Sequence, residues 1–165
     1  MILPTVALTR FAPARNIQHV YKQKKTETSR YGFKIGQLGL LLCLQEKIEI
    51  VDSIDPCPIP NTPQWFAGMI NLRGNLLPVF DMKELLGMDK AGTENWIMIY
   101  GKGSRTAGIY IDKLPVAIQV EQKIEEQPVL PDLLKGYIRN LYGSADSDWI
   151  EMDFERLFSD LHAHF

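Results

Sequence analysis

Histidine is scarce in this chain of 165 residues, which has three, and all of them lie near the chain ends: His19, His162 and His164. These positions suggest terminal arms, so no imidazole is expected on the folded scaffold to act as the base of a nucleophilic triad. The residue spacings typical of zinc, metalloprotease and EF-hand sites are also missing. The sequence therefore predicts no catalytic centre, no metal and no cofactor, and binding is the class of function that remains.

Cysteine and long apolar runs are equally rare. Cys43 sits in the apolar run Leu40–Leu44, where a thiol behaves as a small core residue, and Cys57 lies in a proline-rich turn. No secretory signal is visible, so nothing requires a disulfide. No charge-free apolar stretch reaches the roughly 18 residues of a membrane span, because prolines interrupt the uncharged residues 56–72. The chain is predicted to be cytoplasmic, without membrane insertion.

Charge is small overall and uneven along the chain. The formal net charge is −2, which gives no general attraction to nucleic acid or membrane. Residues 1–25 contain five Lys and Arg and no acidic residue. The rest of the chain contains 13 Lys and Arg and 20 Asp and Glu, a net charge of −7. We therefore expect a flexible basic arm over residues 1–28 and a folded domain over 29–165. An extra helix packed on the body is the alternative for the arm.

Short β-rich runs separated by turn residues recur along the folded part. Many short strands at this spacing are typical of small barrels rather than βαβ units. Residues 55–63 contain four prolines and predict a rigid extended loop, whereas residues 121–143 are weakly patterned and fit strand or loop. The predicted strands are Tyr31–Ile35, Leu38–Leu44, Ile48–Val51, Phe66–Leu72, Leu76–Phe80, Trp96–Tyr100, Thr106–Ile111, Val116–Val120 and Trp149–Met152.

Two short helices are predicted from their capping residues. Asp81 is a good N-cap, Glu84 completes a capping box three residues later, and Gly87 can end the helix in the left-handed conformation. Asp153 similarly begins a helix that we expect to reach His164. Because each Asp follows a predicted strand, the two segments indicate that the chain contains two related halves.

The most informative motif covers residues 65–81, WFAGMINLRGNLLPVFD. In it, Gly68 allows either a bulge or a close approach of two backbones, and Gly74 supplies a positive φ for a hairpin turn. Asn71 and Arg73 fall on one strand face because side chains alternate. Taken alone, the motif fits an ordinary hairpin with an exposed arginine.

As a whole, the motif resembles the chemotaxis coupling proteins of the CheW-like family, and the resemblance extends over roughly residues 31–158. It implies a mainly β fold of two intertwined five-stranded β-barrels, with short capping helices, a C-terminal helix and a hydrophobic groove between the barrels. It also implies a non-catalytic adaptor that joins the cytoplasmic tip of a chemoreceptor to the regulatory domain of a sensor histidine kinase. The region 1–28 and the three tryptophans look closer to the coupling proteins of type IV pilus twitching systems.

The resemblance also implies which residues bind partner proteins. Glu49 and Arg73 match a charged pair near the partner surface of the first barrel, and we expect these two side chains to form an ion pair. Leu44 and Ile50 fall where apolar contacts to the kinase are expected.

Two glycines complete this predicted set. Gly68 matches the glycine that precedes the arginine, and Gly108 matches its counterpart in the second half. Lys47 and Pro115 depart from the family pattern, and residues 121–144 match it poorly, so receptor contacts in the second half are left open.

A nucleic-acid-binding barrel that uses the basic arm is the alternative from another class. Such barrels interleave aromatic residues with Lys and Arg on one sheet face. Here the strand aromatics Phe66 and Phe80 come with little positive charge, and the body is acidic. Neither nucleic acid nor a hydrolase substrate is therefore the expected ligand.

Overall fold

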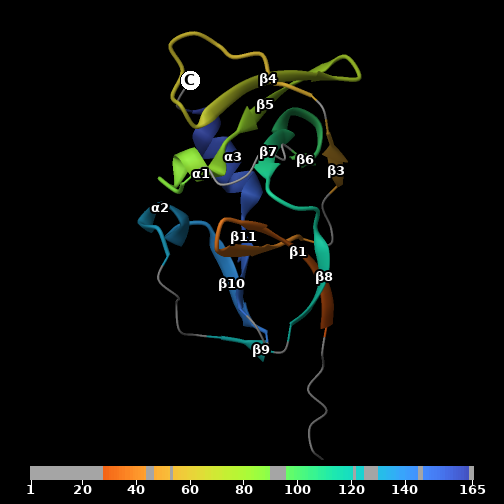
Figure 1. Cartoon of the computed structure of the whole chain (residues 1–165), viewed down its shortest axis with the longest axis vertical. Coiled ribbons are helices and arrows are strands. Elements are labelled where there is room, and N and C mark those ends of the chain that lie inside the picture. The colour runs from red at the N-terminus through yellow and green to blue at the C-terminus, as the bar shows by residue number, and fades with distance from the viewer. Residues whose placement is uncertain are drawn as a thin grey trace, which may run out of the picture.

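A computed structural model of the chain describes residues 28–43, 47–52, 54–89, 96–120, 122–124, 130–144 and 147–163. The predicted arm lies outside these residues except for Thr28, with which the first strand begins. The strands form two sheets, which occupy the upper and lower parts of the molecule in Figure 1.

Sheet A, the lower one, is built from both ends of the chain. Its first two strands form a hairpin around Gly36 and Gln37, as predicted, and its other strands come from the last 50 residues. In spatial order the strands are β8 (Val116–Val120), β1 (Thr28–Ile35), β2 (Leu38–Leu41), β11 (Asp148–Met152), β10 (Ile138–Gly143) and β9 (Gln122–Lys123).

Sheet A closes on itself. Strands β8 and β9 stand at opposite ends of the order, yet a single residue separates them in the chain. Together they make one strand path that pairs with β1 on one side and with β10 on the other. Because closure removes free sheet edges, the sheet is a five-stranded barrel, called barrel A below.

Sheet B, the upper one, comes from the middle of the chain. A short 3-10 helix, η1 (Gly103–Arg105), lies between the strands β6 and β7 given below. In spatial order the strands are β3 (Ile48–Val51), β6 (Trp96–Tyr100), β7 (Ala107–Ile111), β5 (Asn75–Phe80) and β4 (Phe66–Leu72).

Sheet B closes through the proline-rich loop. Cys57, six residues after β3, exchanges two backbone hydrogen bonds with Met69 of β4, at 2.8 and 2.9 Å. The segment that begins in β3 therefore reaches the far end of the sheet and completes barrel B. Two five-stranded barrels with few helices confirm the predicted fold class. Both cysteines are free.

The two barrels have the same arrangement of strands in a different chain order. In each, a strand that leads into an Asp-capped helix pairs antiparallel with the strand before it and parallel with a third strand: β11 with β2, and β5 with β7. This agrees with the relation predicted between the segments after Phe80 and Met152. The related units are not successive halves of the chain, however, because barrel A combines its first and last strands.

The capped helices follow the sequence closely. Asp81 accepts backbone hydrogen bonds from Lys83 and Glu84 at the start of α1 (Met82–Leu85), and Gly87 follows with a φ of +64°. Asp153 accepts one from Arg156 at the start of α3 (Phe154–His162). The last helix ends at His162, two residues before the predicted His164, which lies outside the described residues.

The main core lies between the barrels. Strand side chains alternate, so most strands point one face into their own barrel and the other towards this shared core, to which β8 and β9 contribute no side chain. Helix α3 adds Phe154, Leu157, Phe158 and Leu161, all at most 5% exposed. Burial of each large apolar side chain stabilises the fold by about 1.5–3 kcal/mol. The buried face of α3 therefore helps to hold the two barrels together.

The prediction of strand or loop for residues 121–143 is correct for the strands but wrong for one helix. Within residues 121–143 the structure contains β9, the helix α2 (Asp132–Lys135) and β10. Leu134 of α2 is fully buried, so tertiary packing rather than periodicity defines this helix. None of the described helices is long and apolar enough to cross a membrane.

Candidate functional site

The predicted hairpin places Arg73 at the tip of barrel B. Leu72 pairs with Asn75, so Arg73 and Gly74 alone form the turn between β4 and β5. Their φ values are +53° and +85°, the positive values of a type I′ turn, and the Asn71 side chain accepts a hydrogen bond from the Gly74 N–H at 2.9 Å. An arginine rarely adopts a positive φ, so the backbone of Arg73 is in an unusual conformation.

Arg73 and Glu49 form the predicted ion pair. Arg73 Nη1 donates to Glu49 Oε2 at 2.9 Å, and Nη2 donates to Oε1 at 2.6 Å. The arginine side chain is 70% exposed and the glutamate 24%. The hydrogen bonds from Arg73 lower the pKa of Glu49 below its ordinary value, and the carboxylate raises the pKa of Arg73. The pairing prediction is confirmed, and the two-pronged geometry orients the guanidinium.

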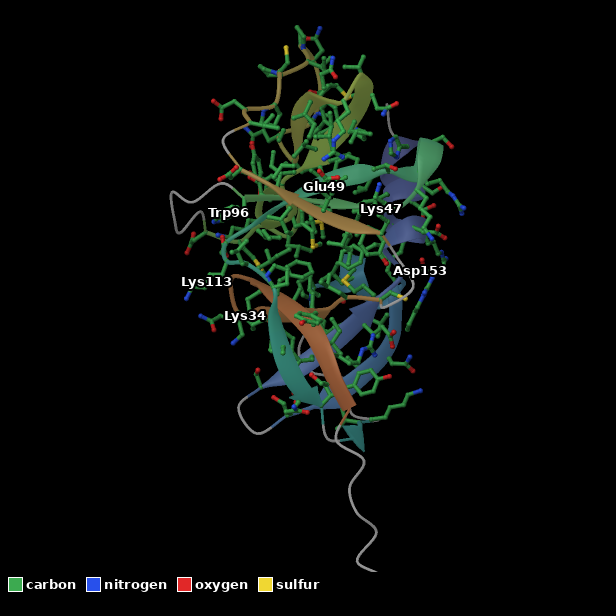
Figure 2. All side chains as sticks on the ribbon, turned by 90° about the vertical axis from the view of Figure 1, so that its right-hand side faces the viewer. Lys34, Lys47, Glu49, Trp96, Lys113 and Asp153 are labelled. Carbon is green, nitrogen blue, oxygen red and sulfur yellow. The ribbon has the colours of Figure 1, made fainter. Side chains whose placement is uncertain are left out.

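A hollow of about 890 Å³ lies beside this pair. Lys47 and Glu49, which Figure 2 labels on barrel B, border it together with the turn between β6 and β7. Leu76 and Ile59 contribute exposed apolar surface, since they are 68% and 43% exposed. The lining therefore combines apolar and charged side chains, which is the composition of many protein-binding surfaces.

Of the two predicted apolar contacts, only Ile50 lies among the described residues, and it does not line the hollow. Ile50 follows Glu49 in β3, so its side chain points to the other face, where it is half-buried against the main core. Leu44 lies outside the described residues. Binding of a kinase through either residue stays a prediction.

Gly68 has a structural role in closing barrel B. Its φ is +132°, and a Cβ at this position would lie 2.3 Å from the Cys57 carbonyl oxygen. The ladder between β4 and β5 also shifts register between Phe66 and Gly68, so both predicted features, a bulge and a close backbone approach, are present. Gly68 lets the proline-rich loop pair with β4, and any effect on partner binding would follow from that.

Gly108 is buried inside barrel B. A Cβ there would lie 2.8 Å from Ile97 Cγ2 and 3.2 Å from both Ile99 Cδ1 and Val79 Cγ2. The glycine therefore makes room for large aliphatic side chains on neighbouring strands. A position that no partner can touch acts on binding only through the shape of the barrel.

Several residues of the site were not singled out from the sequence. Leu76 and Ile59 could have been recognised as apolar residues in turn-rich segments, but nothing local shows that they lie near each other. Lys102 lies in the connection between β6 and β7 and borders the hollow. His162, for which the sequence predicted no role on the folded scaffold, ends α3, where Nδ1 lies 2.7 Å from the Phe158 carbonyl oxygen and the ring borders the hollow.

Within the described part of the chain, no three His, Cys, Asp or Glu side chains gather as metal ligands would. The charged groups of the site are already paired or stand at the rim of the hollow. What this arrangement can do chemically is hold another molecule by apolar contact and oriented charge.

Comparisons with known proteins agree with this geometry. Residues 31–162 match the family model of the CheW-like domain. The chemotaxis protein CheW of Helicobacter pylori is 30% identical over 93 residues, which cover 55% of this chain and only 56% of that protein. CheW of Treponema pallidum is 28% identical over 137 residues, 77% of this chain and 79% of that protein.

A relative from a differently named system and a solved structure complete the comparison. The protein FrzA of Myxococcus xanthus is 28% identical over 103 residues, 58% of this chain and 64% of that protein. The crystal structure of the scaffolding protein TtCheW from Thermoanaerobacter tengcongensis superposes with a TM-score of 0.64 at 25% identity, over 77% of this chain and 89% of that one.

Proposed function

This chain belongs to the CheW-like domain family, and from that premise we propose that it is a non-catalytic signalling adaptor that couples chemoreceptors to a sensor histidine kinase. The partners are the cytoplasmic tip of a receptor and the regulatory domain of the kinase. The adaptor works in the cytoplasm, next to receptor arrays at the inner membrane.

One observation carries the proposal. An exposed Arg73–Glu49 pair, held by a strained turn, stands beside an apolar hollow on barrel B. An exposed ion pair adds little to folding, so its fixed geometry is better explained by recognition. Barrel A lies on the other side of the shared core, which leaves separate surface for a second partner, as a coupling protein requires.

The names of the relatives indicate the pathway. Of the relatives, four are named as chemotaxis proteins or a probable chemotaxis protein, and one is FrzA. We propose chemotaxis or twitching motility through type IV pili. The acidic body does not favour the alternative of nucleic-acid binding, since such binding depends on neutralising phosphate charge.

The test is reconstitution with purified components. The full chain is mixed with a receptor cytoplasmic fragment and the kinase, and phosphoryl transfer to the kinase is measured with each component omitted in turn. We expect kinase output to respond to receptor only when this chain is present, and no phosphorylation by the chain alone. Phosphotransfer without the kinase, or receptor control without this chain, would contradict the proposal.

A further inference from the structure

A carboxylate lies where the two barrels meet. Asp112 directly follows β7 of barrel B and begins the connection that leads the chain to β8 of barrel A. Its Oδ2 accepts a hydrogen bond from the Gly36 N–H at 3.1 Å, and its Oδ1 accepts one from the Lys83 ammonium group. One carboxylate therefore joins a turn of barrel A to a helix that follows a strand of barrel B.

The two donors come from segments that are distant in the chain. Gly36 lies in the turn between β1 and β2, 76 positions before Asp112, and Lys83 lies in α1, 29 positions before it. Figure 2 labels two neighbours of this contact, Lys34 in β1 and Lys113 after Asp112, and both lie on the same side of the molecule. The contact therefore depends on how the two barrels are placed relative to each other.

The segment after α1 reaches the same turn of barrel A. A Cβ on Gly36 would lie 3.4 Å from Met88 Sδ, an ordinary van der Waals distance. The Met88 N–H donates to the Lys83 carbonyl oxygen at 2.8 Å, so the backbone of Met88 is tied to α1. The α1 segment thus meets the turn of barrel A directly through Met88 and also through Asp112.

This contact differs in kind from the apolar core between the barrels. The side chain of Lys83 is 12% exposed and that of Asp112 is 31% exposed, so water and salt screen this pair less than a pair at the open surface. Hydrogen bonds to an ionised carboxylate are strong and directional, whereas apolar attraction has no preferred direction. The core holds the barrels together, and the Asp112 contact limits how one can turn against the other.

We propose that Asp112 is a positioning residue of the adaptor, which fixes the orientation of barrel A relative to barrel B and thereby the relative placement of the surfaces that bind receptor and kinase. The inference rests on the proposed adaptor function and assigns signal transmission to a residue that need touch neither partner. Coupling between two sites requires a part of the molecule whose arrangement both sites influence. The junction between the barrels is that part, since each barrel offers surface to one partner.

The orientation of the barrels is measured with a pair of spin labels on the full-length chain. The labels are attached through Gln119→Cys in β8 of barrel A and Gln64→Cys before β4 of barrel B, both exposed positions, after Cys43 and Cys57 are replaced by serine. Pulsed electron–electron double resonance then gives the distribution of distances between them. Asp112→Ala is expected to widen this distribution about two-fold, because the directional contact between the barrels is lost.

The same variant is then tested for binding and for coupling. Asp112→Ala should bind the receptor fragment and the kinase, each measured alone by calorimetry, as the unmodified chain does. Receptor control of kinase output in the reconstituted assay should fall about five-fold. Asp112→Asn should lie between the two, because its amide oxygen still accepts from Gly36 while the charge that holds Lys83 is gone. Asp112→Asn also provides the test if Asp112→Ala does not fold.

The matched control removes a lysine–aspartate pair that joins no barrels. Lys135 Nζ donates to Asp132 Oδ1 at 2.6 Å within α2, and the Asp132 side chain is 94% exposed. Asp132→Ala should change neither the distance distribution nor coupling.

Four results would overturn the inference: an unchanged distance distribution in the Asp112 variants, full coupling despite a widened one, equal effects in the control, or a loss of affinity for one partner as large as the loss of coupling. The last result would make Asp112 a contact residue. Full coupling by an Asp112 variant leaves the adaptor function standing. If the unmodified chain couples nothing, the adaptor function fails, and the distance measurement decides the orienting role of Asp112 by itself.

Discussion

One arginine–glutamate pair lies inside barrel A, and another lies on the outer surface of barrel B. Arg30 is 8% exposed, and its Nη2 donates to Glu151 Oε1 at 2.9 Å and to the Leu42 carbonyl oxygen at 3.1 Å. Arg73 is 70% exposed at the tip of a hairpin. The same two residue types therefore support folding in one barrel and are available for recognition in the other.

The environment of Glu151 explains why barrel A retains a buried charge. Burial would raise the pKa of Glu151, but hydrogen bonds from Arg30 and Asn140 outweigh it and lower the pKa below the ordinary value. Asn140 donates to Oε2 at 2.7 Å, and the Arg30 guanidinium lies 5.3 Å from the centre of the Tyr142 ring. Arg30 Nε finds no hydrogen-bond partner among the described residues. The network is costly to disturb because removing one charge would leave the other buried without its partner.

The apolar parts of the two interiors also differ. In barrel A, Trp149 fills the space next to Gly32 and Gly39, where an added Cβ would come within 3.0 Å of its ring. Barrel B is filled by aliphatic side chains around Gly108. The interior of a small barrel has room for few large side chains. In each barrel, glycine therefore occupies the positions next to the largest interior side chains.

The largest difference in stability is expected for the two arginines. Arg30→Met leaves the Glu151 carboxylate buried without its cation, which should lower the free energy of unfolding by about 3–5 kcal/mol in a urea titration. Arg73→Met should leave the urea midpoint almost unchanged, because its partner remains hydrated. The double variant Arg30→Met/Glu151→Leu should regain most of the loss. Equal effects of Arg30→Met and Arg73→Met would break the comparison.

A smaller loss is expected from the glycine that closes barrel B. Gly68→Ala places a methyl group against the Cys57 carbonyl at a positive φ, so we expect about 2–4 kcal/mol of destabilisation by the same titration. Gly39→Ala in barrel A meets atoms at 3.0 Å and should cost less. Gly136→Ala is the control, since nothing lies within 4 Å of an added Cβ. A stable Gly68→Ala protein would show that the proline-rich loop does not need this approach.

Acid should affect barrel A more than barrel B. The pKa of Glu151 is lowered in the folded protein, so its contribution to stability is present above the ordinary glutamate range and is lost as the pH falls through the folded pKa. Unfolding free energies from about pH 7 down to about pH 3 should fall less steeply for Glu151→Gln than for the unmodified chain. Glu49→Gln should leave the slope nearly unchanged, because its ion pair is exposed. The reverse order would contradict the buried network.

For coupling of receptor to kinase, the exposed pair of barrel B should matter more than the buried pair of barrel A. Arg73→Ala is expected to fold nearly normally, with an unchanged thermal midpoint, but to transmit the receptor signal to the kinase poorly in the reconstituted assay. Arg73→Lys should restore coupling only in part, because an ammonium group cannot hold Glu49 with two parallel bonds. A folded Arg73→Ala protein with full coupling would remove the functional role of the pair.

The smallest effect is expected from the segment that precedes barrel A. Its basic residues can interact with the acidic body only over about 8 Å at physiological salt, so deleting residues 1–25 should change the melting temperature by no more than a few degrees. Calorimetry of the deleted and full-length chains measures this. A large decrease would show that the segment packs on the body as an extra helix.

What the sequence determined by itself is local. Short β-rich runs between turn residues predicted most of the strands, Asp81 and Asp153 predicted the helix starts, and the turn at Arg73 and Gly74 was placed within one residue. These features are readable because capping, alternation and turn geometry involve residues a few positions apart. The pairing of Glu49 with Arg73, 24 residues apart, came from the family resemblance rather than from these patterns.

Only the tertiary structure decided what depends on distant residues. Arg30 and Glu151 are 121 positions apart in the chain. The sequence around β1 does not show that Arg30 is buried, because its partner comes from β11, two strands away in the sheet. Helix α2 forms because Leu134 packs into a core supplied by other segments. Barrel B closes because the backbone of Cys57 forms hydrogen bonds with that of Met69. Such contacts depend on barrel closure, which brings the first and last strands together and which no local pattern encodes.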